Sequence, residues 1–240
     1  MPMGDCMSLV LMEVAAAVKD ACRLPFTRGY ANAQGMRGLY AIVDPDFCNG
    51  RDPVAVSRRI LVAGGRILQL RCKDTPDQQV LEWARAIAAL KRQFAFTFII
   101  NDRLEIALAA GADGLHIGQG DMPALAARAA LGAGRLLGLS THTQAQVHAA
   151  NALPVDYIGF GAVFKTATKA ADHPVPGPSG LAEAVSGACH PVVAIGGITV
   201  ETVEAVKAAG ASAYAVLSAI TQAADIETVV GNLLSRFFQI

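Results

Sequence analysis

The chain has 240 residues, of which 53% are hydrophobic and 17% charged, so it can bury a sizeable core and is not expected to be intrinsically disordered. Its 20 basic residues balance its 20 acidic ones and 6% of residues are aromatic, which argues against a nucleic-acid-binding protein. No long run is predominantly apolar, so neither a transmembrane helix nor membrane association is expected. The N-terminus lacks the basic region and long apolar run of a signal peptide, so a cytoplasmic location is expected.

The first 36 residues stand apart from the repeating pattern that follows them. They contain a candidate helix near 7–22 and then a stretch with Pro, Gly and Asn. We expect an N-terminal extension over 1–36 and a single domain over 37–240. The extension is either partly disordered or covers one end of that domain.

From residue 38 onward, short apolar runs alternate with segments of helical spacing. The apolar runs predict eight strands, over 38–44, 67–72, 96–101, 114–118, 136–141, 156–163, 191–197 and 213–220. The segments between them predict helices, including 75–93, 143–153, 199–210 and 225–238. Several of these helices end at a glycine, the residue that lets a chain leave a helix in the left-handed conformation and turn back toward a sheet.

Strict alternation of strand and helix predicts a parallel sheet, and nearly continuous apolar strands predict burial on both faces. Eight such units match an α/β fold of the (β/α)8 TIM-barrel type, which needs about 200 residues at least. The alternative is a six-stranded open sheet. That alternative requires two strand predictions to be wrong, and no Gly-x-Gly-x-x-Gly follows the first strand. We therefore predict one TIM barrel.

Polar residues interrupt the end of the predicted strand 67–72, where a barrel of this kind has its active site. The two-residue period of a strand places Gln69, Arg71 and Lys73 on the inner face, with Leu70 and Cys72 toward the helices. Three long polar side chains inside a barrel are costly unless they are paired. They either pair with carboxylates there or form an anion-binding wall, which is the favoured interpretation.

Two carboxylates follow the neighbouring strands. Asp102, after Asn101, ends the strand 96–101, and Asp121 lies in the loop after the strand 114–118. One interpretation is that Asn101 and Asp102 cap the next helix. The other is a magnesium site, because Mg²⁺ in proteins is held by one or two carboxylates together with substrate phosphates.

The remaining strand ends carry hydroxyl groups and glycines. Ser140 and His142 follow each other closely, but no acidic partner stands at a recognisable spacing, so a Ser–His nucleophile is weakly supported. The loop 164–169 could bind a phosphate or close over the site, or simply lie on the surface. Gly197 and Ser218 end the last two strands, where TIM barrels commonly bind phosphate, although Gly197 could also serve a turn alone. His116 is expected to be a packing or surface residue.

Seven motifs, in this order, make the chain resemble the thiamine-phosphate synthase family: QLRCK, INDR, GADGLHIGQGDMP, GLSTH, YIGFGAVFKTATK, VAIGGIT and AVLSAI. The resemblance runs from Gly38 to about Ala224. It implies a transferase that joins 4-amino-2-methyl-5-hydroxymethylpyrimidine diphosphate to 4-methyl-5-(2-phosphoethyl)thiazole, or its carboxylated form. The products are thiamine phosphate and pyrophosphate, and Mg²⁺ is the implied cofactor. In the implied dissociative mechanism pyrophosphate leaves before the thiazole nitrogen attacks.

The resemblance also assigns roles to individual residues. Those that match the pyrimidine-diphosphate site are Gln69, Leu70, Arg71, Cys72, Lys73, Asn101, Ser140 and Lys169. Those that match the thiazole-phosphate site are Thr166, Ala167, Thr168, Gly197, Leu217 and Ser218. The magnesium ligands correspond to Asp102 and Asp121. The residues expected to take part in catalysis are Arg71, Lys73, Asn101, Ser140 and Lys169. The sequence departs from the family at Ala162 and Lys165, where proline is common.

Two other functions remain as alternatives. A thiazole tautomerase of the same family would not need the complete diphosphate-binding wall. A non-catalytic regulator that binds thiazole phosphate would be expected to have lost the carboxylate pair. Small-molecule substrates are the expected partners, and assembly into a homo-oligomer is left open.

Overall fold

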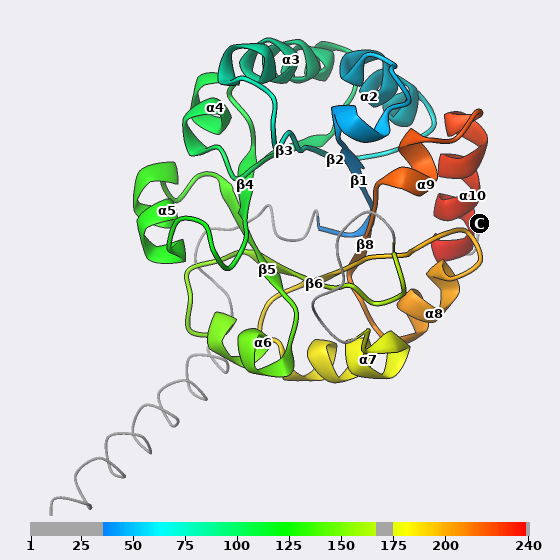
Figure 1. Cartoon of the computed structure of the whole chain (residues 1–240). Helices are drawn as coiled ribbons and strands as arrows, with labels where there is room; N and C mark the ends of the chain where they lie inside the picture. The colour runs from blue at the N-terminus through cyan, green and yellow to red at the C-terminus, as the bar shows by residue number, and fades with distance from the viewer. Residues whose placement is uncertain (1–35, 167–174, 239–240) are drawn as a thin grey trace, which may run out of the picture. The chain divides into compact units, whose positions relative to one another are not determined.

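Eight parallel strands form a closed barrel in the computed structural model, which describes residues 36–166 and 175–238 (Figure 1). Each strand pairs with the next along the chain, and β8 pairs with β1 to close the barrel. The strands are β1 Gly38–Val43, β2 Ile67–Leu70, β3 Thr97–Asn101, β4 Gly114–Ile117, β5 Leu136–Thr141, β6 Tyr157–Gly161, β7 Val192–Ile195 and β8 Ala213–Val216. The predicted (β/α)8 barrel is therefore confirmed, and the six-stranded alternative is wrong.

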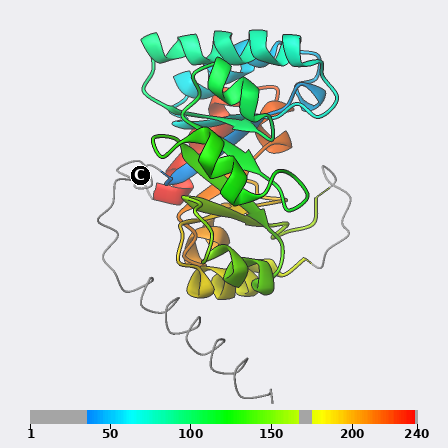
Figure 2. The same cartoon turned by 90° about the vertical axis from the view of Figure 1, so that its left-hand side faces the viewer.

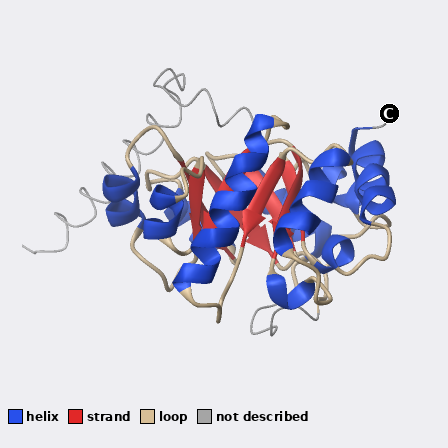
Figure 3. Ribbon diagram, turned by 90° about the horizontal axis from the view of Figure 1, so that it is seen from above, coloured by secondary structure: helices blue, strands red, loops and turns tan. Residues whose placement is uncertain are grey.

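Helices surround this barrel on the outside, as the view along the barrel shows most clearly (Figure 1), and Figure 3 shows helices in front of the strands and to either side of them. Figure 2 shows the same layers from the side of α4 and α5. The α-helices are α2 Pro53–Val62, α3 Asp77–Ala89, α4 Leu104–Ala109, α5 Ala124–Leu131, α6 Gln144–Ala150, α7 Gly177–Gly187, α8 Val203–Ala208, α9 Ser218–Thr221 and α10 Ile226–Phe238. Two 3-10 helices, η2 Pro45–Phe47 and η3 Leu90–Arg92, complete the described elements.

Local sequence signals set where several helices begin and end. Asp52 accepts hydrogen bonds from the first backbone N–H groups of α2, and Pro53 takes the first helical position, where the missing N–H costs nothing. Gly132 ends α5 with a φ of 80°, a conformation that glycine adopts without a steric penalty. These signals return the chain to the next strand.

Two sets of buried side chains form the core. The larger lies between the strands and the helices and includes Leu70 and Cys72, as the two-residue period of β2 predicts. The smaller fills the inside of the barrel and includes Tyr40, Ile99 and Tyr157. The barrel is thus a packed core, and an open cavity remains at its C-terminal end.

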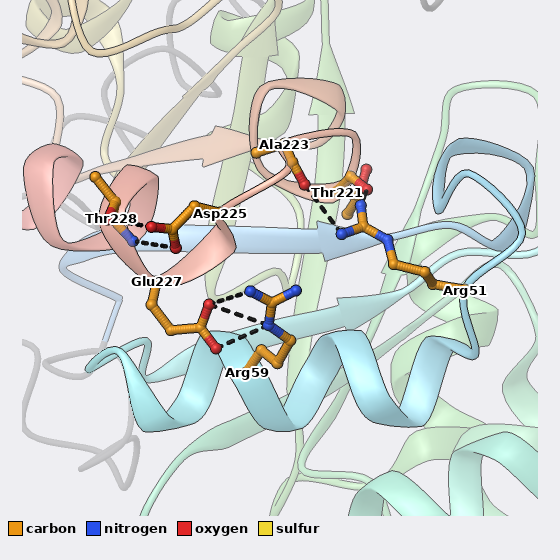
Figure 4. A network of polar contacts seen from close by, with 7 residues as sticks. All are labelled: Arg51, Arg59, Thr221, Ala223, Asp225, Glu227 and Thr228. Atoms are coloured by element: carbon orange, nitrogen blue, oxygen red, sulfur yellow. Dashed lines mark hydrogen bonds and ion pairs between the residues drawn. The ribbon is translucent and has the colours of Figure 1, made fainter.

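A polar network joins the first helix of the barrel to the last (Figure 4). The Arg59 guanidinium on α2 donates to both carboxylate oxygens of Glu227 on α10. Arg51 donates to the backbone oxygen of Ala223 over 2.9 Å, and also to that of Thr221. These contacts lie beside the β1–β8 pairing, so they stabilise the place where the barrel closes.

The observed elements are shorter than predicted at several ends. The predicted helix 199–210 is observed as α8 over Val203–Ala208. At 213–220 the type of element differs, since β8 ends at Val216 and residues 218–221 form α9 instead of continuing the strand. Ile220 is buried there by a helical turn, so its apolar character served a helix and not a strand. The predicted extension over 1–36 lies outside the described residues, apart from Met36. Within the described part of the chain, no helix is long and apolar enough to cross a membrane.

Candidate active site

Two adjoining cavities open at the C-terminal ends of the strands. The first, here called the carboxylate pocket, has a volume of about 190 Å³ and is lined by Lys73, Asp102 and Asp121 among others. The second, the glycine pocket, has a volume of about 220 Å³, and its lining includes Gly196 and Gly197. Residues common to both linings are Ile42, Arg71, Ser140, Ile195 and Ala215. Two ligands bound in these pockets would therefore lie next to each other.

The wall predicted from β2 lines the carboxylate pocket. Gln69, Arg71 and Lys73 face this pocket together with Asn101. Leu70 and Cys72 lie in the core on the helix side, so their side chains do not line either pocket. The Lys73 ammonium lies 2.5 Å from Asp102, and Arg71 forms an ion pair with Asp44. The alternative in which these cations pair with carboxylates is thus realised, although both cations still reach the pocket.

Asp44 is a part of the site that the sequence analysis missed. It directly follows β1, its side chain is completely buried, and it accepts a hydrogen bond from the Arg71 guanidinium. Burial raises the pKa of Asp44, while the charge of Arg71 and its hydrogen bond act in the opposite direction. The position of Asp44 at the end of a strand was the available sequence signal. No spacing rule links this residue to Arg71, which lies 27 residues later in the sequence.

The two predicted metal-binding carboxylates come together. The side chains of Asp102 and Asp121 both line the carboxylate pocket and lie close enough for each to shift the pKa of the other. Asp121 also accepts a hydrogen bond from the backbone N–H of Gly118 over 2.7 Å. Asp102 has a φ of 62°, which is uncommon outside glycine, and its backbone N–H donates to the backbone oxygen of His116. The helix-capping alternative is wrong, since α4 is preceded by Arg103 and has no side-chain cap.

The environment shifts the pKa values of the Asp102 and Asp121 carboxyl groups in opposite directions. Burial raises the pKa of Asp102, and the neighbouring Asp121 adds to this effect against the opposing influence of Lys73. Burial acts the same way on Asp121, but the Gly118 N–H, the interaction with Asp102 and the charge of Lys73 outweigh it and lower the pKa of Asp121. Two carboxyl groups so close together must share either a proton or a cation. This pair therefore suits Mg²⁺, which needs few protein ligands when substrate phosphates supply others.

Among the described residues, no larger metal centre accompanies this pair. Within residues 36–166 and 175–238, no group of three or more His, Cys, Asp and Glu side chains is arranged to hold a metal ion. Two carboxylates are fewer ligands than a zinc site with its three or four side chains would use.

A buried hydrogen-bonded chain forms the floor of the carboxylate pocket. It runs from Gln69 through Tyr40, Tyr157 and His116 to Ser140, with each step between 2.8 and 3.1 Å. Burial raises the pKa of both tyrosines and lowers that of His116 to about 4. His116 is thus an uncharged imidazole at neutral pH.

Tyr40, His116 and Tyr157 are functional candidates that the sequence analysis did not find. A signal was available for His116, because the period of β4 places it on the inner face between Gly114 and Gly118. The opposite glycine explains the space it occupies: a Cβ atom at Gly138 would lie 2.4 Å from the His116 ring and 2.2 Å from that of Tyr157. Gly138 on β5 must therefore be small, because the His116 ring on β4 and the Tyr157 ring on β6 fill the space beside it.

The glycine pocket contains most of the predicted phosphate-binding residues. Gly197, Leu217, Ser218 and Thr166 all line it. Ala167, Thr168 and Lys169 lie outside the described residues. A Cβ atom at Gly197 would meet the backbone oxygen of Lys165 at 2.5 Å, so this glycine allows the β6–α7 loop to approach β7 as well as shaping the turn. His142 also lines this pocket.

Comparison with known proteins gives this geometry a family. Residues 39–220 match the family model described as thiamine monophosphate synthase. The chain belongs to the thiamine monophosphate synthase family. It is 41% identical over 184 residues to the thiamine-phosphate synthase of Chlorobium limicola, an alignment that covers 77% of this chain and 88% of that protein. It is 42% identical over 200 residues to the enzyme of Anaeromyxobacter dehalogenans, with coverages of 83% and 87%.

A solved structure agrees with the sequence relatives. The thiamine phosphate pyrophosphorylase from Pyrococcus furiosus superimposes with a TM-score of 0.80 at 30% sequence identity, over 87% of this chain and 98% of that one. The expected thiamine-phosphate synthase function, and with it the expected transferase class, is confirmed at the level of the family.

Proposed function

We propose that the chain couples a hydroxymethylpyrimidine diphosphate to a thiazole phosphate and releases pyrophosphate, with the diphosphate in the carboxylate pocket and the thiazole phosphate in the glycine pocket. The observation that carries this proposal is that the two pockets adjoin and share Arg71 and Ser140. A reaction that joins two bound molecules gains most from holding their reacting atoms side by side. One ligand per pocket provides that arrangement.

The charges of the carboxylate pocket support its assignment to the diphosphate. Arg71 and Lys73 line this pocket, and they are close enough to neutralise charge on a leaving pyrophosphate. Asp102 and Asp121 would hold Mg²⁺ against the same group. The ion would supply electrostatic stabilisation of the negative charge that develops as pyrophosphate leaves. Asn101 and Ser140 offer further polar contacts, and Lys169 is proposed to act from the loop outside the described residues.

The glycine pocket suits a phosphate monoester with a small apolar ring. Gly196 and Gly197 expose backbone at the end of β7, and Ser218 and Thr166 add hydroxyl groups. Apolar side chains such as Phe164 and Val175 complete the lining. We propose that Ala167 and Thr168 continue the same binding site, and that Leu217 contributes its backbone.

The chain's own residues position the reactants and need not abstract a proton. After pyrophosphate leaves, the thiazole nitrogen supplies the electron pair that forms the new C–N bond to the pyrimidinyl-methyl cation. No general base is required for this step. Burial lowers the pKa of His116 to about 4, so this imidazole is a weak base, which agrees with a step that needs none. A cytoplasmic location is proposed for this small-molecule biosynthesis.

The decisive experiment measures pyrophosphate release by the purified protein with both substrates and Mg²⁺, and again with each component omitted in turn. We expect release only when all three are present. Asp102→Asn should lose most of the activity, whereas Glu82→Gln, an exposed carboxylate on α3, should retain it. Absence of release, together with retained binding of the thiazole phosphate, would contradict the coupling reaction and favour a tautomerase or a regulator.

A further inference from the structure

A direction for the hydrogen-bonded chain beneath the carboxylate pocket follows from its one assigned donor, the Gln69 amide. The Gln69 side-chain amide donates to the Tyr40 hydroxyl over 2.8 Å. The Tyr40 hydroxyl has a single proton, and its other partner among the described residues is the Tyr157 hydroxyl, 2.9 Å away. Tyr40 therefore donates to Tyr157.

The same reasoning assigns the protonated nitrogen of His116. Tyr157 accepts from Tyr40, so its own proton is donated to the His116 Nδ1 atom, 3.1 Å away. An Nδ1 atom that accepts a hydrogen bond leaves the proton of a neutral imidazole on Nε2. That Nε2–H group lies 2.9 Å from the Ser140 Oγ atom and donates to it.

The hydrogen-bonded chain ends at the Ser140 hydroxyl group, whose own proton is not donated to any other member of that chain. Because Ser140 accepts from His116, its own O–H is directed elsewhere, and Ser140 lines both pockets. If every hydrogen bond of this chain had the opposite direction, Ser140 would donate to His116, and it could then only accept a hydrogen bond from a substrate. The direction of the buried chain thus decides whether Ser140 is a donor or an acceptor.

We propose that His116 is a positioning residue that, held as its Nε2–H tautomer by Tyr157, orients the Ser140 hydroxyl to donate a hydrogen bond to an acceptor atom of the substrate between the two pockets. This inference rests on the proposed coupling function. It assigns His116 and Tyr157 a role through Ser140 and not through direct contact with the reacting atoms.

A double-mutant cycle tests whether His116 acts through Ser140. Tyr157→Phe keeps the ring and removes the hydroxyl group that holds the His116 tautomer. We expect it to lower kcat/KM for pyrophosphate release by about threefold to tenfold, the size expected for one weakened hydrogen bond. In the Ser140→Ala background the same change should have almost no further effect, because the two steps lie on one path.

The matched control is Tyr214→Phe. Tyr214 on β8 is equally buried and its hydroxyl donates to the backbone oxygen of Leu233 over 2.9 Å, on the helix side of the barrel. This variant removes a buried hydroxyl hydrogen bond of the same kind outside the pockets. It should lower thermal stability and leave kcat/KM unchanged. His116→Gln, whose carboxamide can accept from Tyr157 and donate to Ser140, should retain more activity than His116→Leu.

A spectroscopic measurement separates this inference from the proposed function. Long-range ¹H–¹⁵N NMR of the histidine rings in the substrate-free protein identifies the protonated nitrogen of His116 and does not depend on turnover. We expect Nε2–H in the wild type and a mixture of tautomers in Tyr157→Phe. A wild-type Nδ1–H tautomer, or equal losses from Tyr157→Phe with and without Ser140, would overturn the inference even if the coupling reaction is observed. Failure of the wild type to release pyrophosphate would instead reject the proposed function.

Discussion

Asp44 and Arg71 form an ion pair across two neighbouring strands in which the carboxylate is fully buried while the Arg71 side chain is 26% exposed. Asp44 also accepts a hydrogen bond from the backbone N–H of Asp46 over 3.1 Å, so its position is fixed from two sides. The guanidinium is therefore held at the boundary of the two pockets by a group that has no contact with solvent. A buried partner restricts an arginine more than a surface carboxylate does, because it cannot move aside.

We expect Asp44→Asn to raise KM for the pyrimidine diphosphate by about tenfold, the effect of losing one charge-assisted hydrogen bond that positions Arg71. Steady-state rates of pyrophosphate release at varied diphosphate concentration measure this effect. Asp46→Asn removes a neighbouring exposed carboxylate and is the control, with an unchanged KM. A lower KM for Asp44→Asn would show that the negative charge of Asp44 matters more than its positioning of Arg71.

Alanine substitutions at Gly197 and Gly111 distinguish the effect of backbone strain from the effect of a close contact with a neighbouring loop. Both have left-handed backbones, with φ of 64° and 67°, so alanine costs about 1 kcal/mol of stability at either position. At Gly197 the new Cβ atom would also lie 2.5 Å from the Lys165 backbone oxygen, whereas at Gly111 nothing lies within 4 Å. We expect Gly197→Ala to raise KM for the thiazole phosphate more than tenfold, roughly the cost of overpacking a tight contact.

Gly111→Ala introduces a similar backbone strain, so it should lower the stability of the protein about as much as the strain at Gly197 does. It should leave the KM values of both substrates unchanged. Equal kinetic effects of the two alanine variants would mean that the approach of the β6–α7 loop to Gly197 does not shape the pocket.

Two ion pairs of this chain should differ greatly in their contribution to stability. Arg128 and Asp156 lie 2.5 Å apart with side chains 12% and 2% exposed, and Asp156 also accepts from the Leu137 N–H. Asp156→Ala leaves a largely buried arginine with backbone carbonyl partners and without this carboxylate, and it removes the acceptor of the Leu137 N–H, so we expect the free energy of unfolding to fall by about 3–5 kcal/mol.

Glu204→Ala is the matched control for this effect. Its pair with Arg236 spans 3.4 Å, with side chains 49% and 63% exposed, and such pairs contribute about 0–1 kcal/mol. Urea unfolding of both variants, compared at equal m values, measures the difference. Similar losses in the two variants would contradict the assignment of Asp156 as a buried anchor.

The network that closes the barrel should weaken in acid. The hydrogen bonds from Arg59 lower the pKa of Glu227 against a smaller opposing effect of burial. A carboxyl group with a lowered pKa in the folded protein stabilises it above its unfolded pKa of about 4.5, and this stability is lost as the pH falls through the folded value. Glu227→Gln should therefore flatten the decline of stability at acidic pH, as measured by thermal unfolding between about pH 6 and pH 3.

Glu183→Gln, which removes an exposed carboxylate on α7, controls for the loss of one surface charge and should retain the wild-type decline. An identical acid decline in Glu227→Gln and the wild type would show that the contact with Arg59 does not contribute to the closure of the barrel.

Much of the candidate site follows from the period of single strands. The two-residue alternation of β2 correctly predicts that Gln69, Arg71 and Lys73 share the inner face and that Leu70 and Cys72 pack against the helices. The same alternation places His116 inside the barrel. A single histidine among apolar residues is more often a packing residue, and the sequence analysis interpreted it in that way. It therefore did not predict that His116 lines the carboxylate pocket. Its role depends on Tyr157 and Ser140, which lie 41 and 24 residues further along the chain.

By itself the sequence determined the alternation of strands and helices and the faces of the β2 residues, and it predicted the closed barrel. These properties depend on neighbouring residues and on hydrophobic periodicity, which are readable locally. Tertiary structure alone decided which side chains meet: Asp44 with Arg71, Asp102 with Asp121, and the chain from Gln69 to Ser140. The stagger and tilt of the strands set those contacts when the barrel closes, and neither is encoded by any one strand.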